Sequence, residues 1–122
     1  MTILTEVEIS EANLRESNFE KMILKKANLV RADLMEANLK EASFEEPDLK
    51  ETHPEMANLD GANLTKTNLR GTFLPIAQIR EAKLTYVYLE GAKLVKNQLA
   101  GTNLVGTYRF MASLAGTNLS RS

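Results

Sequence analysis

Few side chains in this sequence are spaced so that they could carry out chemistry. His53 is the only histidine and the chain has no cysteine, so a metal ion or a relayed proton would find no second ligand of that kind. We interpret His53 as a surface-turn residue. Glu45 and Glu46 are adjacent carboxylates, which could act as an acid–base pair only in a pocket that excludes water. With no glycine-rich phosphate loop and no nucleophile elbow, we predict no catalytic, cofactor-binding or metal-ligating residues, and no enzymatic activity.

A second group of side chains could bind a partner rather than catalyse. It is aromatic and basic, and it gathers in the last third of the chain: Tyr86, Tyr88, Tyr108, Arg109, Phe110 and Met111. Tyrosine and arginine are enriched where protein interfaces bind most strongly. We predict a candidate interface here, with a plain end cap as the alternative.

A five-residue repeat positions all of these residues. The stretch 57–70 shows it most clearly, as Ala-Asn-Leu or Thr-Asn-Leu followed by two variable residues. Counting by fives from Leu4, every leucine falls on one phase, and only Pro54 and Arg109 replace Leu, Ile or Phe at this central position. A small residue usually stands two positions before the centre, and Asn or Asp often stands one before it.

A period of five fits neither a helix nor a flat strand. On a helix, leucines at this spacing would spiral around the axis and form no apolar stripe. On a strand, where side chains alternate, an odd period would send successive leucines to opposite faces. A turn after each short extended side lets every leucine point inward, which gives a solenoid with a leucine interior. Asn, Asp and Gly suit such turns.

The pattern Ala-(Asp/Asn)-Leu-X-X resembles that of the pentapeptide repeat proteins, and the resemblance covers essentially the whole chain. It implies an all-β fold, a right-handed quadrilateral β-helix with four five-residue sides and twenty residues per coil. The 122 residues would then make about six coils in a stack about 29 Å tall. The short, repeat-only architecture also resembles that of cyanobacterial members.

Twenty residues per coil place the central residues in four interior columns. We predict this core: Leu24, Leu29, Leu34, Leu39, Phe44, Leu49, Leu59, Leu64, Leu69, Leu74, Leu84, Leu89, Leu94 and Leu99. We predict one β-helix domain over 1–122, with 1–10 as a degenerate first coil or cap and 107–122 as the terminal coil.

Two faults interrupt the repeat. In 47–56, Pro54 replaces a leucine and cannot donate to a ladder, so we expect this side to bulge outward, with the alternative that the short apolar ring still fills the interior column. Five apolar residues at outer positions would either cover the bulge or form a contact surface: Met35, Met56, Phe73, Pro75 and Ile76. We expect Met35 and Met56 to lie in the same outer column as Ile76. In 107–111, we expect Arg109 to turn outward at the open end, because a buried unpaired arginine is costly.

Charge divides the chain into two halves. Residues 1–61 hold fourteen acidic and seven basic residues, a net charge of −7, whereas 62–122 hold two acidic and eight basic residues, a net charge of +6. This division suggests self-association, either as a dimer or head to tail.

We consider three functions. The leading one is a structural or protein-interaction solenoid that presents rigid outer faces to an unknown protein partner. The second, implied by the family resemblance, is a DNA mimic that binds DNA gyrase and protects it from inhibitors, but a net charge of −1 disfavours it. The third is nucleic-acid binding through the basic half, which the scattered bases disfavour. With no signal peptide or membrane span, we expect a cytoplasmic protein that binds no membrane.

Overall fold

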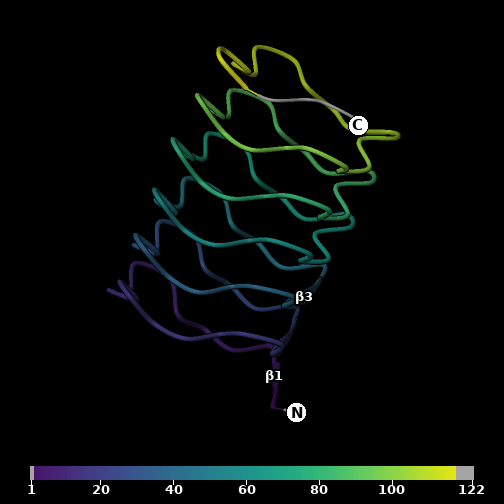
Figure 1. Cartoon of the computed structure of the whole chain (residues 1–122). Coiled ribbons are helices and arrows are strands. Elements are labelled where there is room, and N and C mark those ends of the chain that lie inside the picture. The colour runs from purple at the N-terminus through teal and green to yellow at the C-terminus, as the bar shows by residue number, and fades with distance from the viewer. Residues whose placement is uncertain (1, 118–122) are drawn as a thin grey trace.

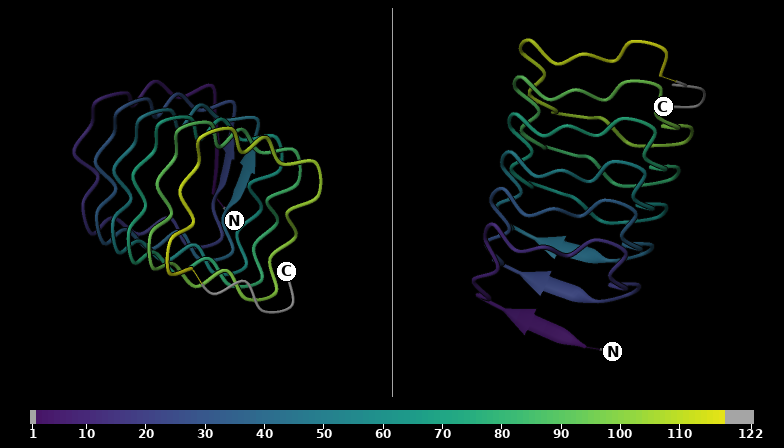
Figure 2. Two further views of the ribbon diagram at one scale, coloured as in Figure 1. Left: turned by 90° about the horizontal axis from the view of Figure 1, so that it is seen from above. Right: turned by 90° about the vertical axis from the view of Figure 1, so that its left-hand side faces the viewer.

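The chain is described here from a computed structural model, which covers residues 2–117. It winds into a stack of similar coils, seen from the side in Figure 1 and from above in the left panel of Figure 2. Three strands, β1 (Ile3–Thr5), β2 (Ile23–Lys25) and β3 (Ser43–Glu45), form a parallel sheet in the order β1-β2-β3. Leu4 pairs with Leu24, and Leu24 pairs with Phe44, so the register advances by twenty residues. The fold is a right-handed quadrilateral β-helix, which confirms the predicted fold class.

The other three sides carry the same parallel register in shorter form. Single parallel bridges join Glu8 to Asn28, Asn13 to Asp33 and Asn18 to Asn38, and equivalent bridges continue up the stack. Each bridge lies at the position before the inward leucine. Residues 3–5, as β1, and Glu8 take part in this ladder. Residues 118–122 of the predicted terminal coil lie outside the described residues.

A tight turn at each corner explains the five-residue period. At one corner, the Ala32 N–H donates to the Leu29 carbonyl at 2.9 Å, and Arg31 has a φ of +58°. A positive φ at the third residue of a four-residue turn is the mark of a type II turn. Every fifth residue from Glu6 to Gly116 has such a φ, and seventeen of these corner residues are not glycine. The repeated turn brings each leucine back to the inside.

Leucine columns and small residues fill the interior. All fourteen residues of the expected core are at most 4% exposed. The small residues two positions before them, such as Ala32, Ala62 and Ala92, are buried as well. An apolar cavity of about 20 Å³ remains where the Leu34 and Leu74 column contains Pro54. A close-packed interior of this kind makes the stack rigid.

The bulge expected at 47–56 is wrong. Pro54 is buried, and the ladder below it is intact, since the Leu34 N–H donates to the His53 carbonyl at 3.1 Å. The turn that follows also closes, with the Ala57 N–H donating to the Pro54 carbonyl at 3.1 Å. The apolar ring therefore stays in the column, and the fault costs only the hydrogen bond for which proline has no donor.

The apolar residues expected to cover that bulge lie on the outside instead. Met56, Phe73 and Ile76 are exposed, with Ile76 at 59%. The prediction that Met35 shares a column with Met56 and Ile76 is also wrong. Residues of one column are twenty apart, so Met35 aligns with Glu55 and Pro75, whereas Met56 aligns with Ile76. Met35 therefore lies in one outer column, Met56 and Ile76 lie in the next, and Phe73 lies in a third.

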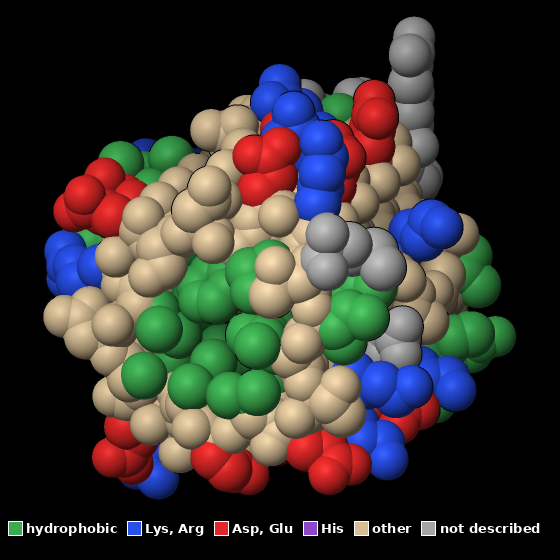
Figure 3. Space-filling model, turned by 90° about the horizontal axis from the view of Figure 1, so that it is seen from below, with side chains coloured by type: hydrophobic (Ala, Val, Ile, Leu, Met, Phe, Trp, Pro, Cys, Tyr) green, Lys and Arg blue, Asp and Glu red, His purple; other side chains and the backbone are tan. Residues whose placement is uncertain are grey.

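The coil at the N-terminal end shows the interior in cross-section. Viewed from below, hydrophobic side chains fill the centre of this end face and charged side chains surround them (Figure 3). Leu4, Ile9 and Leu14 are half-buried and pack against the buried core. Residues 2–117 contain no helix long and apolar enough to cross a membrane.

Candidate interaction surface

Among the described residues, the histidine and the carboxylate singled out in the sequence lie on the surface. His53 is exposed, and its Nδ1 lies 3.5 Å from Oε1 of Glu55. Glu46 is exposed at a corner, and the side chain of Glu45 lies outside the described part of the structure. Within residues 2–117, no group of three His, Asp or Glu side chains is placed to hold a metal ion.

Two of the tyrosines form a stack on the outer surface. Tyr88 and Tyr108 pair in register on adjacent coils, and their rings are 5.0 Å apart and inclined by 8°. The guanidinium carbon of Arg70 lies 4.4 Å from the centre of the Tyr88 ring, and Arg70 Nε lies 3.1 Å from Oε2 of Glu90. Arginine over an aromatic face is an attractive arrangement. The two rings are therefore held in place before any partner binds.

Tyr86 stands at the neighbouring corner and depends on a glycine. Its side chain extends over Gly106, one coil further on, and a Cβ at Gly106 would lie 2.5 Å from Cδ1 of Tyr86. No real Cβ makes so close a contact, so the ring occupies space that only glycine leaves free. Tyr86 is 52% exposed and has a φ of +56°.

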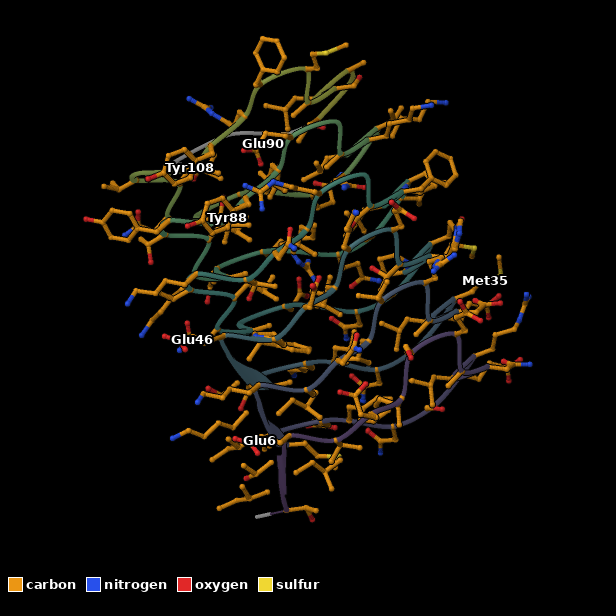
Figure 4. The ribbon with its side chains drawn as sticks, turned by 180° about the vertical axis from the view of Figure 1, so that it is seen from behind. Glu6, Met35, Glu46, Tyr88, Glu90 and Tyr108 are labelled. Atoms are coloured by element: carbon orange, nitrogen blue, oxygen red, sulfur yellow. The ribbon has the colours of Figure 1, made fainter. Side chains whose placement is uncertain are left out.

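A shallow groove runs between this corner and the tyrosine stack. Its volume is about 370 Å³, and five residues line it: Glu46, Lys66, Tyr86, Tyr88 and Tyr108. Figure 4 shows Glu46, Tyr88 and Tyr108 along one edge of the molecule, with Met35 on the opposite edge. We call this groove, defined by those five residues, the tyrosine groove. It combines exposed rings with one acidic and one basic side chain.

The structure adds residues that sequence reasoning missed and leaves others aside. Glu46 and Lys66 precede Tyr86 by forty and twenty residues, so the repeat could have placed them in its column. Arg109, Phe110 and Met111, three of the expected interface residues, are all exposed but do not line the groove. The position of Arg70 depends on how its side chain turns, which the repeat does not specify.

Charged side chains elsewhere pair between adjacent coils. Arg31 lies 3.3 Å from Glu11, and Lys21 lies 3.8 Å from Glu41, each pair following a corner at a spacing of twenty residues. Asp60 accepts hydrogen bonds from Arg80, and these bonds together with its charge raise the pKa of the Arg80 guanidinium. Glu46 and Lys66 share the corner spacing, yet in the described residues they form no ion pair with each other.

The family described as pentapeptide repeats (8 copies) matches residues 2–40, 37–74 and 77–108. The chain belongs to the pentapeptide repeat family. This confirms the resemblance seen in the sequence. No curated protein sequence matches this pentapeptide repeat protein.

Solved structures of the same fold come from several sources. HetL is a pentapeptide repeat protein involved in heterocyst differentiation regulation in the cyanobacterium Nostoc sp. strain PCC 7120. It aligns with a TM-score of 0.58 and 27% identity, over 96% of this chain and 70% of HetL. A pentapeptide repeat protein of the Arabidopsis thaliana thylakoid lumen aligns with a TM-score of 0.55 and 28% identity, over 87% of this chain and 63% of that protein.

A third structure is that of QnrB1, a plasmid-mediated fluoroquinolone resistance protein. It aligns with a TM-score of 0.39 and 17% identity, over 98% of this chain and 77% of QnrB1. At that level of similarity it carries no functional argument. The chain spans 70% and 63% of the first two relatives, so the activities of those whole proteins are not transferred to it.

Proposed function

We propose that this pentapeptide repeat protein is a rigid, non-catalytic interaction module that binds a protein partner along the tyrosine groove. The observation that carries the proposal is the fixed stack of Arg70, Tyr88 and Tyr108 beside the exposed Tyr86. Association is costly when side chains must be ordered on binding. Rings already held by a neighbouring arginine and by the packed coils lose little freedom, so more of their contact energy contributes to affinity.

The same surface supports a protein partner better than a nucleic acid. Arg70 and Arg80 each pair with an acidic side chain, Glu90 and Asp60 respectively. Glu46 lines the groove beside Lys66. A nucleic-acid site needs a dense, unneutralised basic surface to displace counterions from phosphates. Mimicry of DNA needs the opposite, a strongly acidic rod, and the net charge of the chain is −1.

Affinity capture from cells of the source organism tests this proposal. The wild-type chain and the variant Tyr86→Ala/Tyr108→Ala would be immobilised, and the retained proteins compared by quantitative mass spectrometry. We expect the wild type to retain at least one protein that the double variant does not. That protein can be a further copy of this chain. Phe73→Ala is the matched control, because Phe73 is an exposed ring on another side. Equal retention by wild type and double variant would show that the tyrosine groove is not the binding surface.

A further inference from the structure

Two charged residues of the tyrosine groove lack the partners that their position provides elsewhere. Corner residues one coil apart pair as Glu11 with Arg31 and as Lys21 with Glu41. Glu46 and Lys66 have the same spacing and opposite charges, and both are exposed. Within residues 2–117 neither forms an ion pair. Successive residues of a corner column, one per coil, are called its rungs. An acidic and a basic side chain on successive rungs of an open groove can each bind a group of opposite charge on another surface.

We propose that the partner in the tyrosine groove is a second copy of this chain, lying alongside the first with its axis antiparallel. The inference rests on the proposed function, and it names the partner and its orientation. In a two-fold dimer the same surface is used twice, so each contact occurs in two symmetric copies. A two-fold axis midway between the rungs of Glu46 and Lys66 brings Glu46 of each chain against Lys66 of the partner subunit.

One further pair of residues in this corner column is complementary about the same axis. From the N-terminal end, the corner column contains Glu6, Lys26, Glu46, Lys66, Tyr86 and Gly106. The axis that pairs the third coil with the fourth also pairs the second with the fifth, so Lys26 faces the position of Tyr86 of the partner subunit, whose ring extends from there over Gly106 and lies within reach of the long lysine side chain. A lysine ammonium over a tyrosine ring is attractive. In the adjacent column, Glu8 meets Tyr108 of the partner subunit, whose hydroxyl can donate to a carboxylate.

Net charge favours the antiparallel arrangement over a parallel one. Residues 1–61 have a net charge of −7 and residues 62–122 a net charge of +6. Antiparallel axes place the acidic half of each chain beside the basic half of the other, whereas parallel axes would oppose like charges. These interactions act across solvent and are screened beyond about 10 Å at 0.1 M salt. Dimerisation should therefore weaken strongly as salt is raised.

The size of the contact indicates a weak, reversible dimer. A strip along one corner of a stack about 29 Å tall is narrow, and it buries less than the roughly 1,600 Å² of a standard interface. We expect a dissociation constant on the order of micromolar at low salt, by analogy with small transient interfaces. Such an affinity is measurable by sedimentation.

Charge reversal across the two-fold axis gives a direct test. Glu46→Lys opposes two lysines at each contact, and Lys66→Glu opposes two glutamates, so each variant alone should dimerise at least about tenfold more weakly. When the two variants are mixed, every contact again joins a lysine to a glutamate. We therefore expect the equimolar mixture to form a heterodimer at about 20 mM salt, although neither component dimerises alone, and about 500 mM salt to dissociate it.

Matched controls separate this register from a general charge effect. Glu36→Lys and Lys96→Glu change the net charge equally at exposed residues of a different corner, and each should leave the dimer intact. Circular dichroism and thermal unfolding establish that every variant is folded. A wild-type chain that remains monomeric at about 20 mM salt and about 100 μM protein would overturn the proposal. A wild-type dimer whose mixed variants stay monomeric would overturn the antiparallel register.

The outcomes also distinguish this inference from the proposed function. A monomeric wild type whose tyrosine variant loses a captured host protein would overturn self-pairing and leave the groove as a binding surface for another protein. A dimer that survives Tyr86→Ala/Tyr108→Ala unchanged would overturn self-pairing through the tyrosine groove, because the rings would then contribute nothing to self-association. The capture experiment would then decide separately whether the groove binds another protein.

Discussion

Gly106 and Gly91 have almost the same backbone conformation but different surroundings. Their φ angles are +70° and +69°, and both occupy corner positions. At Gly106 a Cβ would collide with the Tyr86 ring, whereas a Cβ at Gly91 would have no neighbouring atom within 4 Å. Alanine substitutions at the two positions can therefore be compared. The change at Gly91 gives the free-energy cost of a side chain at a positive φ, and the additional cost at Gly106 comes from disturbing the Tyr86 ring.

We expect Gly91→Ala to lower the free energy of unfolding by about 1 kcal/mol, the typical cost of a left-handed alanine. Gly106→Ala should cost about 1–2 kcal/mol more, because the added methyl overpacks against the ring and displaces it. Urea unfolding measures the two costs, and the tyrosine resonances in an NMR spectrum report movement of Tyr86. Equal costs with unshifted resonances would show that the ring does not need the space at Gly106.

Within a single five-residue side of a coil, Pro54 shows that the repeat tolerates the loss of one ladder hydrogen bond. In neighbouring coils of the same column, the Leu34 N–H donates to the His53 carbonyl and the Leu74 N–H donates to the Lys93 carbonyl. Proline has no N–H, so the corresponding bond from residue 54 to Phe73 is missing. The ring also fills less space than leucine, next to the apolar cavity of about 20 Å³. The backbone of this side and the turn that follows it nevertheless keep the same conformation as in the other coils.

We expect Pro54→Leu to stabilise the protein by about 1–2 kcal/mol. About 1 kcal/mol would come from the restored ladder bond and a similar amount from the added buried apolar volume. Chemical unfolding monitored by circular dichroism measures the change, and Pro75→Leu is the control, since Pro75 lies at an outer turn position that suits proline. Destabilisation by Pro54→Leu would show that this coil is shaped around the proline ring.

The five-residue period was enough to predict inward leucines and a turn after each unit, and twenty-residue coils followed from the family resemblance. The bulge expected at Pro54 is wrong because the missing donor removes one ladder bond without displacing the side, and burial of the ring keeps it in the column. The tyrosine groove could be predicted only in part. Because Glu46, Lys66 and Tyr86 are twenty residues apart, the repeat places them in one column. The stacking of Arg70 on Tyr88 depends on side-chain rotation, which no spacing specifies.

Along the described stack, the ladder joins positions twenty residues apart, so the outer surface has four sides and a fixed register. Contacts along a column come from residues distant in sequence but adjacent in the stack. Glu46, Lys66 and Tyr86 share one corner for this reason, and the charge division of the sequence becomes a division along the axis. Stability in such arrays is close to a sum of neighbouring-coil terms.

This register gives insertions and deletions an unusual effect, because removing one five-residue unit turns everything after it by one side while leaving a β-helix. Deleting 72–76 should keep the β-rich circular dichroism spectrum but carry Tyr86, Tyr88 and Tyr108 away from Glu46 and Lys66, so self-association should be lost. Deleting 12–16, a unit on the same side, moves all five together and should preserve it apart from the contact of Glu8 with Tyr108 of the partner subunit. Gain or loss of single units could thus redesign the surface of such a protein in one step without rebuilding its core.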